Sequence, residues 1–121
     1  MAGLLSKLLA GLFPDKAKPP SADQLAALVR EGFAPPGGRQ NSSPSTEEFL
    51  SFMQQWPEVM AFGYAVHPAR EDYRITIEGI ACDLLMVDAQ RRDALRAAFT
   101  QRFRSADELV DALQCLYAFW D

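Results

Sequence analysis

The sequence predicts one α+β domain, in which helices pack against an antiparallel sheet of two to three strands and an amphipathic arm precedes the domain. A chain of 121 residues suits a single domain, because domains usually hold about 100–150 residues. Two segments rich in β-branched and aromatic residues follow one another as a hairpin, and the segments around them repeat apolar residues at helical spacing. Strands and helices do not alternate, which argues against a parallel sheet. A content of 49% hydrophobic and 23% charged residues excludes a disordered chain.

Residues 1–20 form the predicted arm with its spacer, and residues 21–121 form the domain. Large apolar residues recur in the arm and cover about half of a helix surface. They are Leu4, Leu5, Leu8, Leu9, Leu12 and Phe13. Pro14 ends this helix, because a proline disfavours helical geometry in the residue before it. The spacer up to Pro20 is polar and proline-stiffened, and every lysine of the chain lies in residues 1–20.

The first helix of the domain should begin after Ser21, which forms a capping box with Gln24. Gly32 fits the position just after the end of this helix. Its core-facing residues are Leu25, Leu28 and Val29.

The second helix should begin at Ser45, with Glu48 completing a capping box, or at Ser43 with Pro44 in the first turn. Pro57 ends it. Its apolar residues follow at helical spacing and are Phe49, Phe52, Met53 and Trp56.

A hairpin over about residues 59–78 should follow, with strands at 59–66 and 73–78. The predicted register places the large apolar residues of both strands on one face. It pairs Val66 with Tyr73, Tyr64 with Ile75 and Phe62 with Ile77. The opposite face then carries the small side chains of Ala61, Gly63 and Ala65. Residues 80–87 form a candidate third strand, although a short apolar run does not separate a strand from a buried helix.

Two further helices are predicted after the hairpin. Asp88 can cap the first, which runs to about Phe103. Ser105 and Glu108 have the capping-box spacing for the second, which would continue to the end of the chain. Its apolar stripe would consist of Leu109, Leu113, Leu116 and Trp120.

Several chemistries find no support in the sequence. The single histidine, His67, lies in the hairpin loop, and an extended chain would carry Cys82 far from it, which argues against a thiolate–imidazole pair. Cys82 and Cys115 are expected to be free, buried thiols, and neither their spacing nor the one histidine supplies a metal site. No cofactor-binding motif is recognised, so we expect neither a metal nor a cofactor, and catalysis is not the favoured function.

Charge and targeting signals favour a cytoplasmic protein that does not bind nucleic acid. The formal charge is −4 and the pI is near 4.9, which argues against a surface built for phosphate contacts. No segment approaches the roughly 18 apolar residues of a membrane span, and the first residues do not match a secretion signal.

Two surfaces are candidate partner-binding sites. The first is the apolar face of the arm, represented by Leu4, Leu5, Leu8 and Leu12. This face could pack on its own domain over the small residues of the first strand, bind a protein partner, or lie on a membrane surface as a minor possibility. The second is the arginine-rich helix, represented by Arg91, Arg92 and Arg96. Those arginines could bind an acidic partner, but they could also pair with the carboxylates of Asp107, Glu108 and Asp111.

The favoured function is therefore a small cytoplasmic, non-catalytic protein-interaction module, whose partner is another protein or a second copy of itself. One alternative is an acidic inhibitor or immunity-type protein that binds a basic partner, because its acidity would steer the encounter. The other alternative is an enzyme or small-molecule binder, with a pocket between sheet and helices lined by Tyr64, Tyr73 and Trp56.

Overall fold

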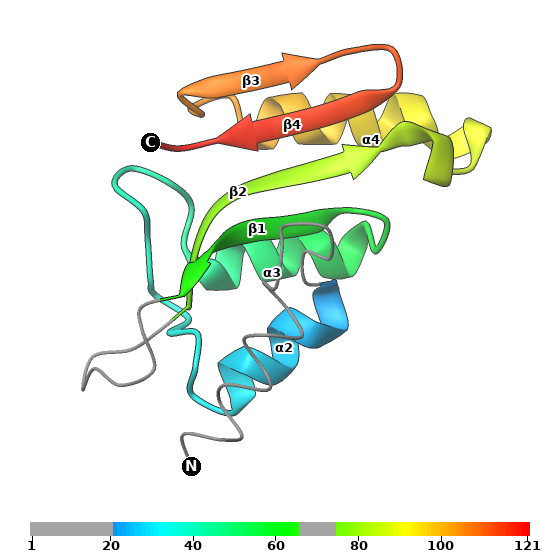
Figure 1. Ribbon diagram of the computed structural model, residues 1–121. Coiled ribbons are helices and arrows are strands. Elements are labelled where there is room, and N and C mark those ends of the chain that lie inside the picture. The colour runs from blue at the N-terminus through cyan, green and yellow to red at the C-terminus, as the bar shows by residue number, and fades with distance from the viewer. Residues whose placement is uncertain (1–20, 66–74) are drawn as a thin grey trace.

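The computed structural model describes residues 21–65 and 75–121, and the predicted arm lies outside them. These residues form an α+β domain in which a four-stranded antiparallel sheet packs against helices (Figure 1). The predicted fold class is confirmed, but the predicted strand count of two to three is wrong. The strand order is β1-β2-β4-β3, so the last strand of the chain lies inside the sheet and not at its edge.

Helices α2 (Ala22–Arg30) and α3 (Thr46–Gln55) begin at the predicted capping boxes. The Ser21 hydroxyl accepts from the Gln24 amide while the Gln24 side chain accepts from the Ser21 amide, and Ser45 and Glu48 do the same for α3. Gly32 follows α2 with a φ of 84°, which a glycine adopts without steric cost. Local capping chemistry thus fixes where both helices start.

Strands β1 (Met60–Ala65) and β2 (Ile75–Asp83) form the predicted antiparallel pair, but the predicted register is wrong by one residue. Tyr64 lies opposite Thr76 and not Ile75, and Gly63 lies opposite Ile77. The register shifts again between Phe62 and Gly63, where β2 contains one extra residue.

This register turns the small residues of β1 toward the helices. Ala61 is fully buried and lies opposite Ile80, which belongs to the same core. Small side chains on β1 leave room for the large isoleucines of β2 and for the helix above them. The arm, for which packing over these small residues is one of the predicted alternatives, lies outside the described residues.

The candidate third strand at residues 80–87 is also wrong. Residues 80–83 complete β2, and Leu84–Met86 form a short 3-10 helix, η1. The Asp83 carboxylate accepts a hydrogen bond of 2.9 Å from the Leu85 amide and so caps η1.

Helix α4 (Ala89–Arg102) agrees with the prediction. Asp88 caps it by accepting from the Gln90 amide, and Phe103 is its last half-helical residue. Leu95, Phe99 and Phe103 lie at steps of four and are fully buried.

The predicted fifth helix is wrong, because residues 108–119 form a hairpin of β3 (Glu108–Asp111) and β4 (Cys115–Phe119). Spacings of four, three and four from Leu109 to Trp120 fit a helix, but burial in β4 has a period of two. Leu116, Ala118 and Trp120 are buried, whereas Tyr117 and Phe119 between them are only half-buried. Since β4 pairs with both β2 and β3, its backbone groups find partners on both sides.

Five aromatic side chains join the helices to the sheet, and we call them the aromatic joint. They are Phe49 and Phe52 from α3, Phe99 and Phe103 from α4, and Trp120 directly after β4. The ring centroids of Phe52 and Phe103 lie 4.8 Å apart in an edge-to-face arrangement, and Phe49 and Trp120 lie 5.5 Å apart. Helices α3 and α4 lie behind the sheet in Figure 1, so the joint fills the space between these two layers.

The opposite side of the sheet, which we call the outer face, carries a second aromatic group. Phe62 stacks on Tyr117 and on Phe119, with centroid distances of 5.4 Å and 6.3 Å. These rings are half-buried and do not belong to the hydrophobic core. Gly79 lies opposite Phe62, where a side chain would overlap its ring.

We expect Gly63→Ala to destabilise the domain by about 1–3 kcal/mol, measured as the free energy of unfolding in urea. An added Cβ at Gly63 would overlap the Thr76 carbonyl at the irregular pairing of β1 and β2. The matched control is Gly37→Ala, because nothing lies within 4 Å of a Cβ added there. Equal stability of the two variants would show that the strands do not approach as closely as described.

Candidate functional site

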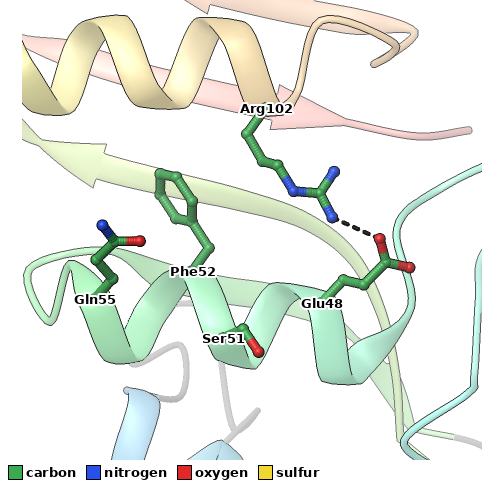
Figure 2. A pocket seen from close by; sticks show the side chains of 5 residues that line it. All are labelled: Glu48, Ser51, Phe52, Gln55 and Arg102. Carbon is green, nitrogen blue, oxygen red and sulfur yellow. Dashed lines mark hydrogen bonds and ion pairs between the residues drawn. The ribbon is translucent and has the colours of Figure 1, made fainter.

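The arginines of α4 project to the two sides that the helical spacing predicts. Arg91 Nη1 lies 2.5 Å from Glu58 Oε2, and its guanidinium lies 4.8 Å from the centre of the Trp56 ring. Arg102 also points toward α3, where it meets Glu48 (Figure 2). Arg91 and Arg102 therefore bind one edge of α4 to the α3 side of the core.

Arg96 lies on the other side of α4 and holds the turn between β3 and β4. Its guanidinium pairs with Asp111, donates to the Ala112 carbonyl at 2.8 Å and reaches the Leu113 carbonyl at 3.4 Å. Arg92 Nε donates to the Val87 carbonyl at 2.9 Å. Asp107, Glu108 and Asp111 are the carboxylates predicted to pair with the arginines of this helix. Among the described ion pairs, only Asp111 does so, with Arg96. The predicted partner-binding role of Arg91, Arg92 and Arg96 stays a prediction, and all three have contacts within the domain.

An open cavity of about 240 Å³ lies between α3 and the end of α4 (Figure 2). Its lining residues are Glu48, Ser51, Phe52, Gln55 and Arg102. This volume is below the roughly 300–1,000 Å³ of typical small-molecule pockets. The ion pair of Glu48 and Arg102 at its rim measures 2.5 Å, so the charges that could recognise a ligand already meet each other.

Glu48 is the most heavily engaged carboxylate of this region. It accepts from the Ser45 amide and pairs with Arg39 at 3.1 Å as well as with Arg102. The Ser45 backbone hydrogen bond, followed by the Arg102 hydrogen bond, lowers the pKa of Glu48 below its ordinary value. The pairs are partly exposed, so each contributes less than about 1 kcal/mol and serves mainly to orient α3 and α4.

The structure does not bring together Tyr64 and Trp56, two of the three residues expected to line a pocket between sheet and helices. Trp56 precedes β1 and packs under Arg91, whereas Tyr64 lies near the other end of β1 and donates to Gln40 at 3.0 Å. Tyr73 lies outside the described residues.

Three large apolar side chains are strongly exposed at one end of the sheet, and we call them the apolar tip. They are Leu85 and Met86 in η1 and Leu113 in the β3–β4 turn, with exposed fractions of 61%, 75% and 86%. The Leu84 amide donates to the Gln114 carbonyl at 2.9 Å, which places η1 beside this turn. Exposed large apolar residues are ordinary when scattered, but a cluster of them is typical of an interaction site.

The two cysteines differ in a way that the sequence analysis did not predict. Cys82 is buried as expected, but Cys115 is exposed and belongs to the outer face, so the expectation of two buried thiols is wrong. Burial, with the nearby charges of Glu58 and Asp83, raises the pKa of Cys82 to about 11. Its thiol is thus protonated and inert at neutral pH. His67 lies outside the described residues, so the structure does not test a pair between it and Cys82.

Among the described residues, no group of three or more His, Cys, Asp or Glu side chains could hold a metal ion. Within the same part of the chain, no helix is long and apolar enough to cross a membrane. Comparison of the chain with protein-family models, with curated proteins and with solved structures finds no match. The function must therefore be argued from the surface of this domain alone.

The apolar tip was missed because its residues were assigned to other elements. The apolar run at 80–87 predicts a third strand for Leu85 and Met86, and helical spacing predicts that Leu113 belongs to the apolar stripe of a fifth helix. The available signal was Asp83, whose side chain can cap a turn and interrupt a strand. A cluster formed by residues about thirty positions apart requires the β2–β4 pairing, which no local pattern encodes.

We expect a disulfide-exchange reagent to modify one thiol of the native protein and two after unfolding in urea. Cys115 should react because it is exposed, and Cys82 should resist because it is buried with a raised pKa. In Cys115→Ser the native reaction should disappear, whereas Cys82→Ser should retain it. Rapid native reaction of Cys82 would contradict its burial.

Proposed function

We propose that this chain is a non-catalytic protein-interaction module that binds its partner through the apolar tip. The observation that carries the proposal is that Leu85 and Met86 in η1 are exposed, and that Leu113 is exposed in the turn to which η1 is hydrogen-bonded. These side chains are large and flexible, and methionine in particular adapts to the shape of a partner. Their burial on binding would contribute roughly 1.5–3 kcal/mol for each fully covered side chain.

The backbone of the tip is held in place before any partner binds. Arg96 fixes the turn through Asp111 and the two carbonyls that follow, and Leu84 ties η1 to the same turn. A preorganised surface loses less conformational entropy on binding than a mobile one, so more of the burial energy becomes affinity. In this proposal Arg96 is a positioning residue and not itself a contact of the partner.

The two alternative functions receive less support from the described surface. The cavity at Glu48 is small, and its charges are already paired, which does not favour a small-molecule binder. The acidic character of the chain fits an inhibitor of a basic partner, but the side chains of the apolar tip carry no charge. We therefore propose that hydrophobic contact, with charge as a secondary influence, governs partner binding in the cytoplasm.

We expect a photoreactive amino acid at position 113 of the full chain to cross-link one protein in living cells. The same probe at position 101, an exposed residue near the far end of α4, is the matched control and should give no such product. Met86→Ser should reduce the yield at position 113 several-fold, because it removes the most exposed apolar neighbour in η1. A melting temperature equal to that of the parent chain would show that the variant stays folded.

The mass of the product identifies the kind of partner. An increase of 13.5 kDa would indicate a second copy of the chain, and any other discrete increase would indicate a different protein. Identical products from positions 113 and 101, or no product from either, would contradict the proposal.

A further inference from the structure

We propose that the outer face of the sheet is the docking site of this chain's own N-terminal segment, residues 4–13. This contact is independent of the apolar tip, which lies at one end of the sheet. It would give the two-layered domain a third layer and leave the arm bound to its own domain, not to a partner.

The outer face of the sheet is apolar. Phe62, Tyr117 and Phe119 stack into one aromatic surface that spans β1 and β4 across the glycine of β2. Met60 extends this surface along β1. The described helices α3 and α4 pack on the opposite side, where the aromatic joint lies (Figure 1). An apolar sheet face is normally covered by a further layer of secondary structure.

The N-terminal segment and the outer face complement each other in charge. Glu108 lies opposite Phe119 in the sheet. Burial is the largest cause that raises the pKa of Tyr117, and the charges of Glu108 and Glu78 raise it further. Glu108, which is exposed, thus places a carboxylate beside the aromatic surface. All lysines of the chain lie in its first 20 residues, whereas acidic residues outnumber arginines in the remainder. Lys7 lies within the segment itself, and Lys16 and Lys18 follow it.

The spacer between the segment and the domain is long enough for the segment to reach the outer face. Residues 14–20 separate the segment from Ser21, and seven extended residues span roughly 23 Å. A domain of this size has a radius of gyration of about 13 Å, so the spacer is long enough to pass an edge of the sheet. Because β1 is an edge strand, the chain need not cross any other strand to reach Phe62.

An anionic membrane is a less favourable binding partner for the outer face than the N-terminal segment is. The exposed carboxylate of Glu108 would repel acidic headgroups. A second copy could offer the same segment, but docking within one chain is favoured because the short spacer keeps the segment at high effective concentration.

The native Cys115 provides the test, since it is exposed on the outer face two residues before Tyr117. A nitroxide spin label on Cys115 of the full chain should broaden the methyl resonances of Leu4, Leu5, Leu8 and Leu12. Their intensities should fall below half of those measured after the label is reduced. The control places the label at Ala97→Cys in a Cys115→Ser background, because Ala97 is exposed on α4 behind the sheet. The control label should leave these intensities nearly unchanged.

A mixed sample separates the two possible sources of the segment. It combines isotope-labelled chains without nitroxide and nitroxide-bearing chains without isotope, in equal amounts. Broadening within one chain and none in the mixture is the expected result. Broadening of similar size in the mixture would assign the contact to a second copy and overturn docking within the chain. Absence of broadening in both samples would overturn the docking site itself.

Two charge insertions supply a matched pair of variants. Leu8→Glu places a carboxylate in the predicted apolar half of the segment, and Ala10→Glu places the same group in its other half. Leu8→Glu should restore the intensities of Leu4, Leu5 and Leu12, whereas Ala10→Glu should leave them broadened. Equal effects of the two variants would contradict docking through the apolar half.

Discussion

Edge-to-face packing of the aromatic joint is the constraint on which the rest of this domain depends. Phe103 is central to it, because its ring contacts those of Phe49, Phe52, Phe99 and Trp120 within 6 Å. These contacts connect α3, α4 and the end of β4, so the joint holds the C-terminal hairpin in register with the helices. The indole Nε1 of Trp120 is buried with no hydrogen-bond partner among the described residues, and such a group costs roughly 1–3 kcal/mol. The packing of five large rings must offset this cost.

The surface follows from this internal arrangement. Since the joint fixes α4 over the hairpin, Arg96 can reach the β3–β4 turn and hold Leu113 beside η1. On the other side of the sheet, β4 presents Tyr117 and Phe119 to Phe62 of β1. The central strand β4 therefore supplies residues to the core and to the outer face. The β3–β4 turn next to it supplies Leu113 to the apolar tip. Both proposed interaction surfaces depend on the position of β4.

The sequence was sufficient for features that are decided within a few residues. The capping boxes at Ser21 and Ser45, the cap at Asp88 and the glycine after α2 all lie where their local chemistry predicts. The C-terminal hairpin was not predicted, because leucines spaced by three or four residues fit a helix, and only the hydrogen bonds that β2 offers to β4 decide for a strand. The register error arises because matching apolar residues across the two strands puts Phe62 and Ile77 on one face. In the structure Ile77 lies in the core and Phe62 lies on the outer face. The candidate site was least predictable, because the apolar tip joins residues that only the sheet topology brings together.

Urea unfolding of Phe103→Ala, followed by far-ultraviolet circular dichroism and tryptophan fluorescence, tests the role of the aromatic joint most directly. The loss of stability should be about 3–5 kcal/mol, as for other buried phenylalanines, and both signals should report one transition. Phe62→Ala is the matched control and should cost less, because its ring is half-buried on the outer face. A smaller loss for Phe103→Ala than for Phe62→Ala, or separate transitions for helices and tryptophans, would contradict a fold that depends on this joint.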